Sequence, residues 1–272
     1  MFKKLTLFIG LTSLALALSA CGSNQTTHSM SNMDHSNAEK PSTASGTAAK
    51  GGGTYLDQKL SESVLSAELY DSEGKKFNFE SLKGKYLVIA NFLTSCQEIC
   101  PMTSVNIRDI GDAINKAGMS NHMVAMVLSV DPDRDIPSRL KAYKELYESN
   151  NWVVASGPKS SIDLIWKFFG APAKREVFSE ADAKQMPVDW QTGKPNTYDM
   201  VHADLVIIVD DKGSWRWLNL GSPKMRGKEI PAKMKAFLSS HGLENLVKPE
   251  EPTWSIDSVI SALNELTGHN IK

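Results

Sequence analysis

The amino-acid sequence predicts an α/β fold in which a mixed sheet is flanked by helices on both faces. Two continuous apolar runs, Tyr86–Leu93 and Met123–Val130, are long enough for buried strands and too short for core helices. Amphipathic segments of helical length follow each run, so strands and helices alternate. Two later strands, joined by a turn at Asp210–Gly213, precede a final helix of the folded body. This order predicts a mixed sheet rather than a helical bundle.

Each predicted element is bounded by residue types that begin or end such elements. Proline is tolerated in a first helical turn and glycine often follows a last one, so Pro101 and Gly118 bound the first helix. The elements are, in chain order, a strand over Tyr86–Leu93, a helix from Pro101 to before Gly118, a strand over Met123–Val130, a helix over Ser138–Ser149, a strand over Trp152–Ala155, a helix over Ile162–Phe169, strands over Leu205–Val209 and Trp215–Leu218, and a helix over about Glu229–Ser240.

Two segments of the body depart from this alternation. Residues 173–198 are polar and contain prolines, which predicts an irregular excursion between the two halves of the sheet. Residues 246–272 form a C-terminal extension that contains Pro249 and Pro252 and then one amphipathic helix. That helix can either pack on the body or hang free.

Composition and charge exclude two classes of protein. The 272 residues carry a formal net charge of −1, which excludes a strongly basic nucleic-acid binder, so we expect no nucleic-acid partner. The apolar run that approaches membrane length, Leu5–Ala20, lies behind Lys3 and Lys4 at the N-terminus. A multi-span membrane protein is therefore excluded as well.

The N-terminal segment predicts export and lipid attachment. A basic start followed by an apolar run is typical of a signal peptide, here residues 1–20. Small residues before Cys21 resemble the bacterial lipobox, which implies that Cys21 carries lipid and anchors the chain to the bilayer. We expect a lipid-anchored protein on the extracytoplasmic face of a bacterial cell membrane. The alternative is a buried helix with an incidental Cys21.

Residues 21–53 are polar and rich in small residues, so they predict a flexible tether before a folded domain over 54–245. The tether contains imidazole and thioether side chains, the soft ligands that suit Cu(I). They are His28, Met30, Met33 and His35. This tract is a candidate auxiliary metal site, and chance enrichment in a low-complexity linker is the alternative.

Cys96 and Cys100 are the candidate functional thiols. They follow the first buried strand and precede a helix, and Cys100 stands directly before Pro101. Proline disfavours a helical conformation in the residue before it, which predicts Cys100 as the helix N-cap. The positive end of the helix dipole then favours thiolate over thiol. A structural disulfide closing a small loop is the alternative.

Two thiolates make an incomplete metal site, and His202 is the candidate third ligand. It stands at the entry to the buried strand Leu205–Val209, where it can reach the sheet edge that carries the cysteine loop. Cys96, Cys100 and His202 together form a sulfur and nitrogen set that suits Cu(I) and can also bind Cu(II). A surface histidine, or a buried one with ordinary partners, is the alternative.

Three sequence blocks together resemble the Sco/SenC family. They are Thr94–Met102 with its Cys-x-x-x-Cys-Pro, Ser129–Pro137 with Asp-Pro-Asp-Arg-Asp, and Tyr198–Gly213 with its histidine. The resemblance implies a thioredoxin-like fold and copper, as Cu(I), Cu(II) or both, bound by Cys96, Cys100 and His202. It implies delivery of copper to the CuA-containing subunit of cytochrome c oxidase, or reduction of the CuA cysteines before metal loading.

One feature departs from the family pattern, and another suggests a different metal site. Cys100 and His202 are 102 residues apart, longer than we expect for the family, and we assign the surplus to Glu180–Thr197. Asp131, Asp133 and Asp135 could form a carboxylate metal site, but a strand-to-helix turn with capping carboxylates is the favoured interpretation.

Two other functions compete with copper delivery. Cys96 and Cys100 could serve as the redox thiols of a metal-independent thiol-disulfide oxidoreductase. Three residues separate them, whereas two are usual in thioredoxin-like oxidoreductases. The chain could also be a passive extracellular copper store that uses the tether.

Overall fold

The structure is a computed structural model that describes residues 46–272 except residue 187. All described residues belong to one unit of the chain, Met33–Lys272. The predicted signal peptide, the lipidation site Cys21 and the tract with His28, Met30, Met33 and His35 lie outside the described residues.

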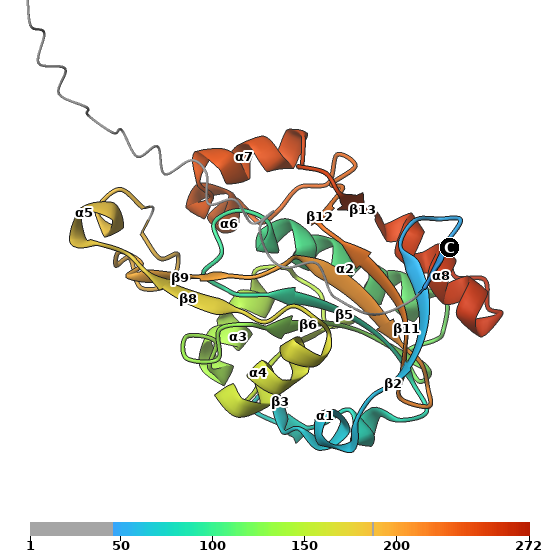
Figure 1. The fold of residues 1–272 in the computed structure, drawn as a ribbon. Coiled ribbons are helices and arrows are strands. Elements are labelled where there is room, and N and C mark those ends of the chain that lie inside the picture. The colour runs from blue at the N-terminus through green and yellow to red at the C-terminus, as the bar shows by residue number, and fades with distance from the viewer. Residues whose placement is uncertain (1–45, 187) are drawn as a thin grey trace, which may run out of the picture. The chain divides into compact units, whose positions relative to one another are not determined.

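One mixed sheet forms the centre of the described unit (Figure 1). Among the described residues it has nine strands, in the order β1-β2-β11-β10-β5-β6-β7-β3-β4. Their bounds are β1 Thr47–Ala48, β2 Thr54–Lys59, β3 Leu69–Asp71, β4 Lys76–Phe77, β5 Tyr86–Phe92, β6 Met123–Ser129, β7 Val153–Ser156, β10 Leu205–Val209 and β11 Ser214–Leu220.

Parallel strands lie at the centre of this sheet and antiparallel strands on either side. β5, β6 and β7 are parallel neighbours, whereas β10 runs antiparallel to β5 and β11 antiparallel to β10. The five residues of β10 are all buried, because helices and neighbouring strands cover both of its faces. The predicted α/β class with a mixed sheet flanked by helices is confirmed.

Helices cover both faces of the sheet (Figure 1). α2 packs on β5 and β6 and against α8, while α4 packs against α1 on the other side. The hydroxyls of Ser104 and Tyr143, 2.9 Å apart, join α2 to α3. The helix bounds are α1 Glu62–Ser66, α2 Cys100–Lys116, α3 Pro137–Glu145, α4 Lys159–Phe168, α5 Glu180–Ala183, α6 Ala232–Phe237, α7 Ser240–Val247 and α8 Ile256–Thr267.

The segment predicted as an irregular excursion contains regular structure, and this corrects the prediction. β8 (Lys174–Val177) and β9 (Tyr198–Val201) form an antiparallel pair, with α5 between them in the chain. The pair escaped prediction because each strand has only four residues and β8 is mostly charged, although β9 buries Met200. In Figure 1 it projects from the sheet together with α5.

Three further features of the fold differ from expectation. The helix predicted over about Glu229–Ser240 is shorter, α6 at Ala232–Phe237, because Leu238 takes an extended conformation, and Ser239 then caps a second helix, α7, that was not predicted. The sheet starts upstream of residue 54, since β1 pairs with β2 inside the range predicted as tether. Another short parallel pair, β12 (Ser222–Pro223) with β13 (Thr253–Trp254), was not foreseen.

The C-terminal helix packs on the body, which settles the choice left open by the sequence. α8 contacts α2 and buries Val259 and Leu263 completely. Tyr86 donates a hydrogen bond from its hydroxyl to the carbonyl oxygen of Leu266 at 3.3 Å. In the part of the chain described here, no helix combines the length and apolar character needed to cross a membrane.

Replacing Gly111 tests how closely α2 packs against the turn before β7. In an open helix interior, alanine in place of glycine stabilises by roughly 0.5–1 kcal/mol. A Cβ atom at Gly111 would overlap the backbone carbonyl of Asn151. We expect Gly111→Ala to lower the free energy of unfolding by about 1–3 kcal/mol in urea denaturation. Lys116→Ala, at the exposed end of the same helix, should change it by less than about 0.5 kcal/mol. Stabilisation by Gly111→Ala would contradict this packing.

Candidate functional site

The two candidate thiols lie on the loop that joins β5 to α2. Cys96 is partly exposed, and Cys100, the first residue of α2, is buried. Both are free thiols, and the backbone N–H of Cys100 donates to the Sγ atom of Cys96 at 3.3 Å. The fold therefore brings the pair together at the end of a central strand.

Two local expectations about Cys100 are wrong. The N-cap of α2 is Ile99, and Cys100 stands inside the first turn, where the following proline is tolerated. Burial raises the pKa of the Cys100 thiol well above its usual range, and the hydrogen bond with Cys96 adds to that effect. Loss of solvation outweighs the helix dipole, so the isolated protein favours the neutral thiol at this position.

His202 lies between β9 and β10 and is buried, with 3% of its surface exposed. Asn91 of β5 holds it: the Asn91 side-chain amide nitrogen is 3.0 Å from His202 Nδ1 and donates to the carbonyl oxygen of Ala203 at 2.6 Å. The Asn91 carbonyl oxygen accepts from the backbone N–H of Leu205 at 3.0 Å, which fixes the orientation of the amide. One buried asparagine thus ties the histidine to the strand that leads into the cysteine loop.

The Nδ1 atom of His202 is already engaged in this arrangement. It lies near the Asn91 amide and 3.2 Å from the carbonyl oxygen of Ala203, with a carboxylate oxygen of Asp204 at 3.8 Å. The Asn91 amide can donate to Nδ1 when Nδ1 carries no proton, and Nδ1–H can donate to the Ala203 carbonyl oxygen when it does, so the tautomer decides the role of this atom.

The predicted ligands are not assembled into one metal site. Across residues 46–272, apart from residue 187, no group of three or more His, Cys, Asp or Glu side chains is placed to hold a metal ion. The structure brings Cys96 and Cys100 together and attaches His202 to the same strand through Asn91. The ligand role of His202 therefore stays a prediction.

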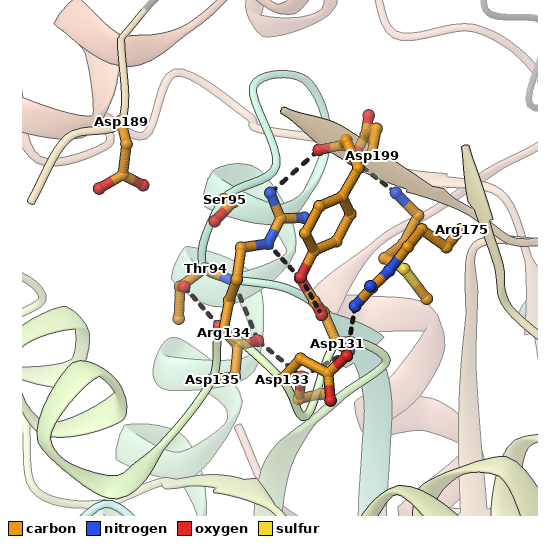
Figure 2. Close-up of polar contacts among 12 residues, drawn as sticks. Thr94, Ser95, Asp131, Asp133, Arg134, Asp135, Arg175, Asp189 and Asp199 are labelled. Carbon is orange, nitrogen blue, oxygen red and sulfur yellow. Dashed lines mark hydrogen bonds and ion pairs between the residues drawn. The ribbon is translucent and has the colours of Figure 1, made fainter. Parts of the chain in front are cut away.

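The start of the cysteine loop is fixed by a buried carboxylate that the sequence did not point to in this role. Asp135 accepts hydrogen bonds from the Thr94 backbone N–H, from the Thr94 hydroxyl at 2.5 Å and from the Ser129 hydroxyl at 2.6 Å. Figure 2 shows Thr94 and Asp135 facing each other across this contact. The end of β6 and the turn after it therefore set the position of the loop.

The role predicted for the three aspartates of this turn is only partly correct. The turn exists, but the N-cap of α3 is Ile136, without a side-chain hydrogen bond, so none of the carboxylates caps the helix. Asp135 binds Thr94, while Asp131 pairs with Arg134 and accepts a hydrogen bond from Tyr198 at 3.0 Å. Arg134 is a local partner, but Thr94 and Tyr198 lie on distant segments, which a capping argument from neighbouring residues could not find.

The β8–β9 pair is fastened to this turn by an aromatic and ionic cluster. The Arg134 and Arg175 guanidinium groups lie 3.8 and 4.0 Å from the ring centroid of Tyr198. Arg175 also pairs with Asp133 (Figure 2). Since His202 directly follows β9, these contacts help determine where the histidine segment leaves the pair.

The far side of the cysteine loop is held by α7. The backbone N–H of Ser239 donates to the carbonyl oxygen of Gln97 at 2.9 Å. A Cβ atom at Gly242 would overlap that same carbonyl oxygen, so glycine is needed for the helix to approach this closely. Sequence reasoning missed this contact, because the predicted helix ended at about Ser240 and Gly242 lay beyond it.

The pKa of Asp135 yields a prediction about stability. Burial and the neighbouring Asp131 raise this pKa to about 6, despite the hydrogen bonds from Ser129 and Thr94. The folded state then binds the proton more tightly than the unfolded state, whose aspartate pKa is about 3.9. The stability from this proton is fully present below about pH 4 and is lost as the pH rises through about 6.

We therefore expect the wild type to lose stability relative to Asp135→Asn between pH 4 and pH 7, by at most roughly 3 kcal/mol. Urea denaturation at several pH values measures the difference. Asp163→Asn, which removes an exposed carboxylate of α4, controls for a general charge effect. A difference between wild type and Asp135→Asn that does not vary with pH would contradict the assignment.

Comparisons with known proteins find similar sequences. A "Putative copper-binding protein" of Stutzerimonas stutzeri is 25% identical over 153 residues, covering 56% of this chain and 67% of that protein. Two further curated relatives are matched over 57% and 64% of their own lengths, so the chain spans less than two thirds of each.

Solved structures of similar proteins are also found. Bradyrhizobium japonicum ScoI with copper bound is 26% identical, with a TM-score of 0.45, covering 63% of this chain and 96% of that one. BsSco, described as a member of the Sco family of cytochrome c oxidase assembly proteins, is 22% identical, with a TM-score of 0.42, covering 61% and 86%.

The decisive comparison is with the family model described as SCO1/SenC. It matches residues 63–239, which is 65% of the 272 residues and includes both cysteines, the aspartate turn and His202. The chain therefore belongs to the SCO1/SenC family.

Proposed function

We propose that this protein binds copper and either delivers it to the CuA site of cytochrome c oxidase or prepares the thiols of that site. The observation that carries the proposal is the pair Cys96 and Cys100, placed side by side at the end of β5. His202, bound to Asn91 of the same strand, is the third ligand that we assign.

The donor chemistry of the pair favours copper over harder metals. Thiolate sulfur is a soft ligand and suits Cu(I), and an added imidazole extends the set to Cu(II). Cys96 is partly exposed and offers an entry from solvent, while Cys100 lies beneath it. The copper-related name of the Stutzerimonas relative supports the same metal. Copper is the cargo here, which the protein takes up and gives away.

We further propose a location and a partner. The run Leu5–Ala20 followed by Cys21 supports a lipid anchor that holds the chain at the extracytoplasmic face of a bacterial cell membrane. The partner is the CuA-containing subunit of the oxidase, as membership of the family and the description of BsSco suggest. In the tether, His28, Met30, Met33 and His35 form an auxiliary copper site.

A second candidate function is thiol-disulfide exchange without a metal. One observation favours it: Cys96 is accessible, and the buried Cys100 lies directly behind it as a resolving thiol. Reduction of a small disulfide substrate by the metal-free protein would support this alternative. Absence of turnover, together with copper binding, would favour the first.

Replacing the two cysteines tests the thiol assignment. The reduced wild type should take up about one copper per chain, with a thiolate-to-Cu(II) charge-transfer band. Cys96→Ser and Cys100→Ser should each abolish that band and weaken binding in a copper titration. Cys21→Ser is the matched control, because it removes a cysteine and leaves the pair intact. Full copper binding by either serine variant of the pair would contradict the proposal.

Replacing His202 tests the third ligand. We expect His202→Ala to lower copper affinity by about tenfold or more, because the imidazole that we assign as the third ligand is lost. His122→Ala is the control, since that histidine is exposed at the start of β6. Competition titration with a chelator of known affinity measures both. If His202→Ala retains the affinity of the parent, the ligand set is wrong.

A further inference from the structure

Arg139 of α3 is buried, and its guanidinium group uses all five of its N–H bonds. Nε donates to the Thr94 hydroxyl at 2.5 Å, and one Nη2 hydrogen goes to the Ser95 hydroxyl at 2.9 Å. Nη1 and Nη2 form a forked pair with the carboxylate of Asp189, at 3.2 and 2.5 Å, and Nη1 also reaches the Gln191 side chain at 3.3 Å. A buried arginine satisfied in this way is held in one orientation.

The other side of the contact is a short segment, Asp189–Gln191, which we call the latch. Burial alone would raise the pKa of Asp189, but the hydrogen bonds and charge of Arg139 lower it to about 2. Trp190, also in the latch, donates from Nε1 to the backbone carbonyl of Thr94 at 2.8 Å. The latch therefore holds the cysteine loop in two ways. Asp189 fixes Arg139, which binds the loop, and the Trp190 side chain binds the loop backbone directly at Thr94.

The position of this contact matters more than its strength. Thr94 and Ser95 directly precede Cys96, and on the other side Gln97 is held by Ser239. With both neighbours fixed, the backbone of Cys96 has little freedom, and its sulfur stays beside the N–H of Cys100. The latch itself lies within Glu180–Thr197, the segment that makes the spacing from Cys100 to His202 long.

We propose that Arg139 and the latch are positioning elements of the thiol site, which keep Cys96 and Cys100 at the separation where they act as a pair. The proposal deepens the proposed function and rests on it, because it concerns the same two thiols. Holding two thiols together raises their effective concentration toward each other. A loosened loop lowers that concentration and so disfavours any state that needs both sulfurs at once.

The equilibrium constant for forming the Cys96–Cys100 disulfide measures this effective concentration without any metal. The reduced protein reacts with one glutathione disulfide: the two thiols form one S–S bond, the glutathione S–S bond breaks, and two reduced glutathione molecules carry the two hydrogens away. The full chain in a Cys21→Ser background contains only the pair as thiols. Titration with glutathione buffers then gives one equilibrium constant.

Arg139→Lys keeps the positive charge but cannot make the two parallel hydrogen bonds to the Asp189 carboxylate. Asp189→Asn keeps the size of the side chain but removes its negative charge. We expect each to lower the equilibrium constant for disulfide formation by about tenfold. Because both act through one contact, the double variant should be no worse than the more affected single variant. Trp190→Phe, which removes the hydrogen bond to Thr94 and replaces the larger ring that contacts Arg139 and Tyr143 with a smaller one, should lower the constant by a smaller factor.

Asp210 and Arg216 provide a matched pair of controls. Asp210 directly follows β10, at the end of the strand away from His202, and Arg216 lies on β11. Asp210 is buried, pairs with Arg216 at 3.1 Å and accepts backbone N–H bonds, as Asp189 does. Asp210→Asn and Arg216→Lys should change the constant by less than about twofold, even where they lower the melting temperature similarly. A purely structural role for Arg139 would make the two sets of variants behave alike.

An unchanged constant in Arg139→Lys and Asp189→Asn, with near-ultraviolet circular dichroism showing a native fold, would overturn the proposal. If those variants do not fold, Trp190→Phe tests the proposal instead. An unchanged equilibrium constant for disulfide formation in Trp190→Phe would also overturn the proposal. A wild type that takes up no copper would defeat the proposed function, while the glutathione equilibrium would still report on the latch. The two failures are therefore distinguishable.

Discussion

The hydrogen bonds between Asp135 and Thr94 are the constraint on which the geometry of the site depends. A loop that leaves a central strand and enters a helix must turn sharply, and its backbone groups lose the partners that the sheet supplied. The Asp135 carboxylate satisfies the Thr94 N–H and hydroxyl together, with Ser129 as a third donor. The turn after β6 thus fixes the loop after β5, and parallel pairing of these two strands brings both to the same edge.

The remaining contacts of the site build outward from this point. Arg139 binds the hydroxyl of Thr94 from α3, and Trp190 binds its carbonyl, so one residue is held from three segments. Asn91, three positions earlier on β5, holds His202 and the start of β10. Thiols and histidine are therefore set by one strand and its immediate continuation. Under the proposed function, copper ligands that are about a hundred positions apart in the sequence are thus attached to one frame.

The sequence predicts the frame of this protein better than it predicts the contacts that hold the site. β5, β6 and β10 are continuous apolar runs and α2 is bounded by Pro101 and Gly118, so local patterns suffice to find them. β8 and β9 are short strands whose attachment depends on Arg134, Arg175 and Tyr198 meeting from separate segments. No local pattern contains such a meeting. The pair Cys96 and Cys100 was found because both thiols are close in sequence, whereas Asp189 and Gly242 act on the loop from far away.

The helix dipole and burial act in opposite directions on Cys100, and the outcome matters for the chemistry of the pair. Position at the start of α2 favours a thiolate, but the side chain is almost fully buried and its pKa is raised. A thiolate that burial disfavours forms readily only when a cation replaces the lost solvation, so binding of a soft metal ion and loss of the proton are coupled. Under the proposed function, the buried Cys100 thiol stays neutral until copper arrives. Burial thus limits unwanted reactions of the inner thiol, while the accessible Cys96 remains the point of first contact.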